Sequence, residues 1–80
     1  MLIQVGELAK RAGITVRTLH HYEQTGVLLP SARSAAGYRL YNLADVQRLL
    51  MIQALAKAGL ELAEIRDFLE QESLPLAGLL

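Results

Sequence analysis

The sequence contains no cysteine, and this absence excludes both a disulfide framework and a thiolate metal site. It has no apolar run approaching the roughly 20 residues that a membrane helix needs. Met1 is not followed by the basic stretch and apolar core of a secretion signal. No internal repeat or low-complexity tract is evident. From the absence of a membrane helix and of a secretion signal we expect a soluble, cytoplasmic protein.

The chain also lacks the residue combinations that catalysis requires. Its eight carboxylates are scattered, and its two histidines, His20 and His21, are adjacent. These residues supply no pair of nucleophile and base, and 80 residues are too few to enclose a substrate pocket. Adjacent residues of a helix diverge by about 100°, and no third ligand is nearby, so the histidines do not predict a metal site. We therefore expect a protein without enzymatic activity, cofactor or metal.

What is present is the composition of one small globular domain, with 52% hydrophobic and 20% charged residues. The charges are unevenly distributed along the chain. Residues 1–48 carry six basic and three acidic side chains, whereas residues 49–80 carry two basic and five acidic ones. An electropositive half is typical of a small DNA-binding protein, although chance often produces an imbalance of this size.

Two short helices are predicted at the start of the chain, at residues 5–12 and 16–25. Apolar side chains recur there at helical spacing: Leu8, Ala12, Ile14, Leu19 and Tyr22. Gly13 and Gly26 are expected to end the two helices in a left-handed conformation, and Thr15 is expected to cap the second helix. Two short helices joined by a tight turn form a helix-turn-helix, whose second helix can enter the DNA major groove.

The helical spacing of apolar residues is absent from residues 27–41. The segment SARSAAG has the residues of a turn, and the alternating Tyr38, Arg39, Leu40 and Tyr41 that follow it resemble a strand. This pattern predicts a small β hairpin, or wing. Asn42 and Asp45 then have the spacing of a capping box that opens a third helix over about residues 43–58.

A fourth, amphipathic helix is predicted from an apolar stripe that we expect to be buried, namely Leu62, Ile65, Phe68 and Leu69. Residues 73–80 form an apolar tail in which Pro75 and Gly78 oppose regular structure while the leucines favour burial. The expected fold is therefore mainly α, a winged helix-turn-helix with about four helices and a small β wing. We place this domain at residues 1–72 and treat 73–80 as the possible start of a dimerisation helix.

Several sequence runs occur in the order and spacing of one known family. They are GELAKRAGITVRTLHHYEQTGVLLP, AGYRLYN, the segment Lys57-Ala-Gly59, and LELAEIRDFL. Over about residues 3–70 the chain resembles the N-terminal DNA-binding domain of MerR-family transcription regulators. The His20–His21 pair and the wing pattern from Pro30 to Arg39 most resemble the TipA-type branch. The resemblance implies a bacterial regulator that forms dimers, bends and untwists promoter DNA, and carries an effector domain after this one.

In the second helix, five residues are predicted to contact DNA: Thr15, Arg17, His20, His21 and Tyr22. Arg17 lies in the first turn, where side chains of a reading helix reach base edges or phosphates, and a solvated arginine is the alternative. His20 stands where the family most often has an arginine, which predicts a weaker contact. The alternative for the two histidines is a pair of half-exposed polar side chains. The Tyr22 ring is expected in the core, with its hydroxyl able to reach a phosphate.

Outside that helix, four residues are candidates for contacts with the DNA backbone: Arg33, Tyr38, Arg39 and Lys57. Tyr38 and Arg39 resemble the family's wing residues that hold a phosphate and a sugar edge, but Tyr38 could instead cover the core. Arg33 could bind a phosphate or remain in solvent. The family usually has a basic residue where this chain has Ala56. Lys57 could take over that role, or, rotated by about 100°, point into water.

The resemblance also implies partners. We expect double-stranded promoter DNA bound at a palindrome, a homodimer in the full-length protein, and RNA polymerase, with no membrane partner. The 80-residue chain alone is expected to be largely monomeric and to bind DNA weakly, because a single module makes few phosphate contacts. The alternative is a MerR-like adaptor that binds a co-chaperone instead of DNA, which would suit the zero net charge and the histidine at position 20.

Overall fold

The computed structural model describes residues 1–73, and residues 74–80 of the predicted tail at 73–80 lie outside this range. In chain order its elements are β1 (Ile3–Gln4), α1 (Val5–Ala12), α2 (Val16–Thr25), β2 (Ala32–Arg33), β3 (Arg39–Tyr41), α3 (Leu43–Lys57) and α4 (Leu62–Ser73). Four helices with a small three-stranded sheet match the predicted winged helix-turn-helix. None of the helices in residues 1–73 is long and apolar enough to cross a membrane.

The helix ends form where the local sequence predicts them. The Thr15 hydroxyl accepts a hydrogen bond from the Thr18 amide at 3.0 Å and thereby caps α2. Gly13 and Gly26 follow α1 and α2 with φ angles of 71° and 78°, which side chains rarely tolerate. At the start of α3, the capping box expected from the spacing of Asn42 and Asp45 is complete.

The sheet joins the N-terminus of the chain to the wing. Its strand order is β1-β3-β2, and both pairings are antiparallel. Ile3 pairs with Tyr41, and Ala32 pairs with Leu40. The sequence predicted an extended lead-in before α1 but not its pairing with β3, because the two strands lie far apart in the chain.

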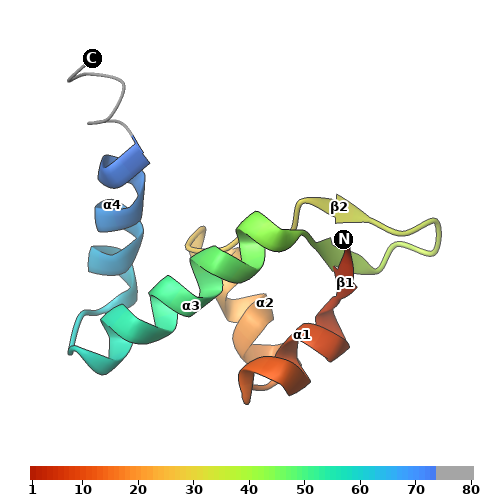
Figure 1. The fold of residues 1–80 in the computed structure, drawn as a ribbon, viewed down its shortest axis with the longest axis horizontal. Coiled ribbons are helices and arrows are strands. Elements are labelled where there is room, and N and C mark those ends of the chain that lie inside the picture. The colour runs from red at the N-terminus through yellow and green to blue at the C-terminus, as the bar shows by residue number, and fades with distance from the viewer. Residues whose placement is uncertain (74–80) are drawn as a thin grey trace.

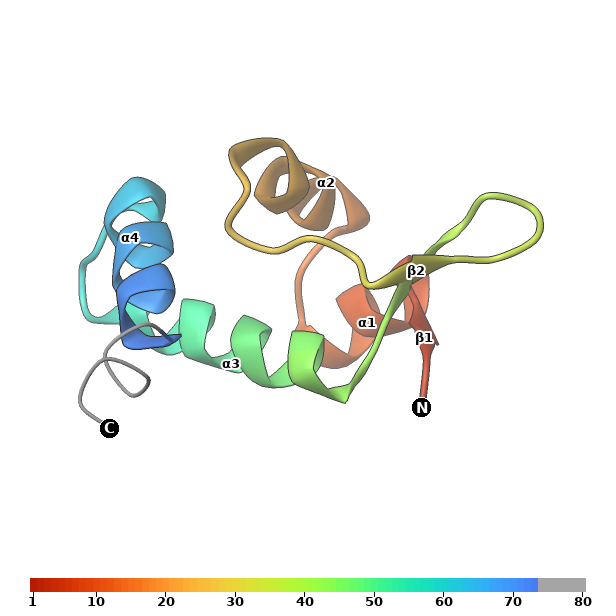
Figure 2. The same cartoon turned by 90° about the horizontal axis from the view of Figure 1, so that it is seen from above.

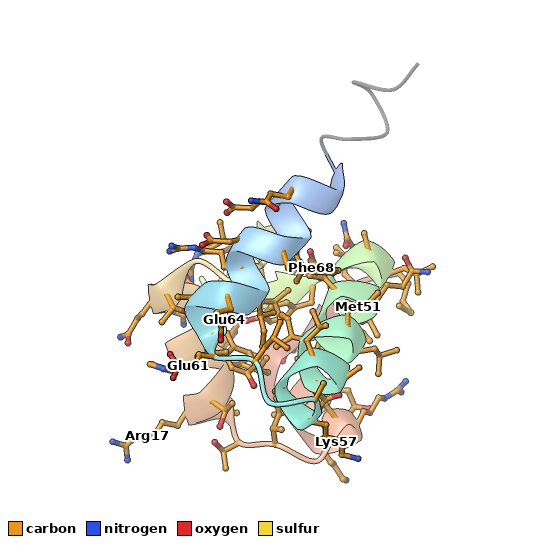
Figure 3. The ribbon with its side chains drawn as sticks, turned by 90° about the vertical axis from the view of Figure 1, so that its left-hand side faces the viewer. Arg17, Met51, Lys57, Glu61, Glu64 and Phe68 are labelled. Atoms are coloured by element: carbon orange, nitrogen blue, oxygen red, sulfur yellow. The ribbon has the colours of Figure 1, made fainter. Side chains whose placement is uncertain are left out.

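All four helices, β3 and the segment after α2 contribute to one core. Its buried residues are Leu8, Ala9, Leu19, Val27, Leu28, Tyr41, Leu49, Ile52, Ile65 and Leu69. The predicted apolar stripe of α4 is only partly buried. Phe68 is 43% exposed, so the expectation that it belongs to the core is wrong. Ile65 and Leu69 already fill the surface facing the core, and Phe68 lies on the flank of α4 that faces Met51 (Figure 3).

In Figure 1, α3 crosses in front of α2. Seen from above, α2 and the loop between β2 and β3 lie on one side of the molecule and α3 runs along the other (Figure 2). The helix α4 stands at the end opposite the β2–β3 loop. A long surface composed of α2 and the wing is therefore not covered by α3.

Three polar side chains from α3 and α4 hold the ends of the helix-turn-helix. Gln53 donates to the carbonyl oxygen of Ala12 at 3.0 Å. Arg66 donates to the carbonyl of Thr25 at 3.1 Å. Arg48 donates to the carbonyl of Val27, just beyond α2, at 2.7 Å. The carbonyls of Ala12 and Thr25 lie in the last turns of α1 and α2, where carbonyls have no partner within the helix, and the positive charge of Arg66 at the end of α2 favours the helix dipole. The contacts fix α1 and α2 against the rest of the domain.

Candidate nucleic-acid interface

The helix α2 has one buried face and one exposed face. Leu19 is completely buried, whereas Arg17 and His21 are exposed. The Arg17 side chain extends away from the body of the molecule (Figure 3) and forms no hydrogen bond or ion pair with any residue in 1–73. A guanidinium held outward near the start of a helix, without an internal partner, is available to base edges and phosphates.

The other predicted residues of α2 lie nearer to the core. His20 is half-buried, and Tyr22 is half-buried with its ring packed against the core. The Tyr22 ring is therefore placed as predicted. The hydroxyl of Thr15 already caps α2 and lies 2.9 Å from the hydroxyl of Thr18. Thr15 thus has a structural role in forming the helix that presents Arg17.

The wing has a tight, hydrogen-bonded tip. The Ser34 amide donates to the carbonyl of Tyr38 at 2.8 Å, and the Gly37 amide donates to the carbonyl of Ser34 at 2.9 Å. Gly37 has a φ of 89°. The Tyr38 side chain is 59% exposed, so the alternative that it covers the core is wrong. Tyr41, three residues later, occupies the core instead.

The two wing arginines share a partner that the sequence did not predict. Glu23, in the last turn of α2, forms ion pairs with Arg33, at 3.2 Å, and with Arg39. Arg33 also donates to the carbonyl of Gly37 at 3.3 Å. One feature of the sequence points to this role. An acid at the C-terminal end of a helix opposes the helix dipole, so a nearby cation is expected to compensate it.

Lys57 is not gathered with the other candidates. It is exposed at the end of α3, and Figure 3 shows it on the opposite side of the molecule from Arg17. Glu61, which immediately precedes α4, and Glu64, in the first turn of α4, lie on the same side of α3 as Arg17 in that view. The positive and negative halves of the sequence therefore do not become opposite faces of the molecule, because α4, which carries acidic side chains of the second half, lies on the same side of α3 as α2 (Figure 2).

Tyr41, in β3, has a perturbed hydroxyl group. Burial raises the pKa of its hydroxyl, the negative charge of Glu23 raises it further, and Arg39 opposes this change. The hydroxyl oxygen is buried and has no hydrogen-bond partner. No three acidic, histidine or cysteine side chains gather within residues 1–73 as a metal site would require. The surface of α2 and the wing offers cationic and aromatic side chains, including Arg17 and Tyr38.

Comparisons with known proteins agree with this geometry. A model of the MerR HTH family regulatory proteins matches residues 3–72. Nodulation protein NolA of Bradyrhizobium elkanii is 51% identical over 67 residues, which cover 84% of this chain and 31% of that protein. The HTH-type transcriptional activator TipA of Streptomyces coelicolor is 47% identical over 70 residues, which cover 88% of this chain and 28% of that protein. The chain thus spans less than a third of the length of these relatives.

A solved structure shows the same architecture. The crystal structure of HiNmlR, a MerR family regulator lacking the sensor domain, bound to promoter DNA, matches this chain with a TM-score of 0.80 and 30% sequence identity. The match covers 92% of this chain and 59% of that one. The similarity to TipA agrees with the branch expected from the histidine pair and the wing. The chain therefore belongs to the MerR family of helix-turn-helix regulatory proteins, and its fold is a winged helix-turn-helix.

Proposed function

We propose that this chain is the DNA-binding module of a transcription regulator, in which α2 enters the major groove and the wing contacts the neighbouring backbone. The observation that carries the proposal is the orientation of Arg17, which is exposed and unpaired within residues 1–73 while Leu19 anchors the opposite face of its helix. The exposed Tyr38 and the partly exposed Arg39 lie on the wing, on the same side of the molecule as α2 (Figure 2). HiNmlR, which shares this fold, binds promoter DNA.

The predicted contacts have different strengths of support. The exposed side chains of Arg17, His21 and Tyr38 are accessible to DNA as they stand. His20 is half-buried and is assigned a weaker, shorter contact with a phosphate. Arg33 is occupied by contacts within the protein, and Lys57 points away from Arg17, so we give both a smaller part in binding.

In the full-length protein, we propose that two such modules form a homodimer on a palindromic promoter site and act with RNA polymerase in the cytoplasm. The physical support is the salt dependence of phosphate contacts. One module with about four or five contacts binds weakly and loses affinity steeply as salt rises, whereas two modules on linked half-sites reach specific affinities.

A gel-shift experiment with Arg17→Ala and Arg39→Ala tests the proposed surface. The probe is a duplex enriched by the wild-type chain from a random-sequence pool, and Arg11→Ala is the matched control. Arg11 also carries one positive charge, but it pairs with Glu7 and lines a pocket between α1 and α3. We expect Arg17→Ala to weaken binding by about 1–3 kcal/mol and to relax sequence preference. Arg39→Ala should lower the slope of log affinity against log salt concentration by the equivalent of about one phosphate contact.

The control variant should bind nearly as the wild type does. Equal retardation of all three variants and the wild type would refute the assigned surface. If the wild-type chain enriches no duplex at all, DNA binding by this module is refuted, and the adaptor alternative becomes the hypothesis to test.

A further inference from the structure

The carboxylate of Glu23 connects α2 to both strands of the wing, β2 and β3. Its Oε1 atom accepts a hydrogen bond from Nε of Arg39, which lies in β3. Its Oε2 atom accepts one from Nη2 of Arg33, in β2, at 3.2 Å. Both carboxylate oxygens are therefore used, and both contacts span many residues of sequence.

The ion pairs are partly shielded from solvent. The side chains of Glu23 and Arg39 are 22% and 30% exposed, and that of Arg33 is 49% exposed. Salt screens such contacts less than it screens pairs that are fully in water. An unpaired Glu23 would also destabilise α2, because the dipole of α2 disfavours a negative charge in its last turn. Both effects favour a persistent connection between α2 and the wing.

The two arginines differ in which of their guanidinium nitrogens are used within the protein. Arg33 uses Nη1 on the carbonyl of Gly37 and Nη2 on Glu23, so its terminal nitrogens are engaged within the protein. Arg39 uses Nε, which leaves the outer edge of its guanidinium for a phosphate oxygen. Arg33 therefore forms a brace between the wing tip and α2, whereas both terminal nitrogens of Arg39 stay available for a phosphate.

We propose that Glu23 is a positioning residue that fixes the wing relative to α2 before DNA arrives, so that Arg17 and Arg39 are presented at a set separation. This inference rests on the proposed DNA-binding function. Its physical basis is preorganisation: a wing that is already held loses less conformational entropy on binding than a free one. Glu23 acts through Arg33 and Arg39 and does not itself contact the phosphates, which would repel it.

The test compares Glu23→Gln with Glu7→Gln. Both variants remove one negative charge with little change of shape, but Glu7 pairs only with the exposed Arg11 on its own helix. The first measurement, without DNA, is ¹⁵N relaxation and amide exchange at Ser34 and Gly37, whose hydrogen bonds close the wing tip. The second is the affinity for a mixed-sequence duplex at several salt concentrations, with thermal denaturation as a check of folding.

Simple electrostatics predicts that losing a carboxylate strengthens binding to a polyanion. Positioning predicts the reverse. We expect Glu23→Gln to increase motion and exchange at the wing tip and to weaken DNA binding by about threefold to tenfold. The slope of log affinity against log salt concentration should fall by the equivalent of about one phosphate contact. Glu7→Gln should leave the wing unchanged and bind at least as tightly as the wild type.

A second variant guards against misfolding in α2. Arg33→Lys lies on the exposed wing and keeps the charge, but lysine lacks the fork that reaches Gly37 and Glu23 together. It should loosen the wing tip and weaken binding in the same direction as Glu23→Gln. The inference is overturned if the wild-type chain binds and Glu23→Gln binds as well or better, or if the wing is unchanged in either variant. Absence of binding by the wild type would instead contradict the proposed function.

Discussion

Arg17 and Leu19 lie two positions apart on α2 and have opposite environments. Side chains two residues apart point about 200° away from each other around a helix, so when Leu19 is packed in the core, Arg17 must face outward. Its exposure therefore follows from the burial of its neighbour. At the residue scale, the burial of one leucine orients the arginine that is most important for the proposed function.

Tyr41 lies in the core although its side chain carries a polar hydroxyl group. Its ring is completely buried, and its hydroxyl has no hydrogen-bond partner. Desolvating a hydroxyl without a new hydrogen bond costs free energy, commonly about 1–3 kcal/mol in proteins. The ring offsets this cost by filling the space between β3 and the helices. Tyrosine is therefore not required here by any internal contact of its oxygen.

Replacing Tyr41 with phenylalanine should leave the free energy of unfolding at neutral pH unchanged or raise it by about 1 kcal/mol. The variant should also remove a dependence on pH. Burial raises the pKa of the Tyr41 hydroxyl in the folded state, so the unfolded chain loses that proton first, near pH 10. Wild-type stability should thus fall as pH rises above about 10, and the fall should be smaller in Tyr41→Phe.

Urea denaturation at neutral and alkaline pH measures both effects. Tyr38→Phe is the matched control, because Tyr38 is exposed and should respond little. A loss of more than about 1 kcal/mol in Tyr41→Phe at neutral pH would show that the hydroxyl makes a stabilising contact.

At the scale of elements, the start of α3 also fixes the base of the wing. Asp45 accepts a hydrogen bond from the Asn42 amide at 2.9 Å to complete the capping box. The same carboxylate oxygen accepts one from the Ser31 hydroxyl at 2.5 Å. Ser31 immediately precedes β2, and Asn42 immediately follows β3. One cap therefore begins a helix and closes the hairpin at its base.

Asn42→Ala should lower the free energy of unfolding by about 1 kcal/mol, because alanine cannot accept the hydrogen bond from the Asp45 amide. Asn42→Ser should retain most of the stability, since serine is a comparable cap. Gln47→Ala is a control at an exposed position of the same helix and should change stability by less than about 0.5 kcal/mol. Chemical denaturation gives all three values; equal losses in the alanine and serine variants would argue against the cap.

At the scale of the whole molecule, the zero net charge conceals an uneven surface. The exposed side of α2 carries Arg17, and the acidic start of α4 lies on the same side of α3 as α2 (Figure 2). A nucleic acid approaching α2 therefore meets both attraction and repulsion. Charges separated by more than about 10 Å are largely screened at 0.1 M salt, so this repulsion should be felt mainly at low ionic strength.

Glu61→Gln should strengthen binding to a mixed-sequence duplex by about twofold at low salt, and the gain should disappear at high salt. The structure gives the Glu61 side chain no ion pair within residues 1–73, so its replacement should not disturb the fold. Glu61→Asp keeps the charge and is the control; it should bind as the wild type does. Fluorescence anisotropy across a salt series provides the comparison. Unchanged or weaker binding by Glu61→Gln at low salt would show that Glu61 does not repel the bound DNA.

Many elements of the fold could be predicted from the sequence because their causes are local. Gly13 and Gly26 end helices, Thr15 and Asn42 begin them, and the helical spacing of apolar residues marks the buried faces. The pairing of β1 with β3 was not predicted, because it depends on distant residues meeting. The exposure of Phe68 was missed for a similar reason: periodicity gives the apolar side of α4 but not how much of that side α3 covers.

The sequence by itself determined the helices, their caps, the position of the wing and the outward direction of Arg17, because each follows from contacts within a few residues. Only the tertiary structure decided that Glu23 takes both wing arginines, that Tyr41 rather than Tyr38 enters the core, and that Lys57 lies away from Arg17. These outcomes depend on how separate elements pack. Packing brings together charges and rings from distant parts of the chain, and no local pattern specifies which of them will meet.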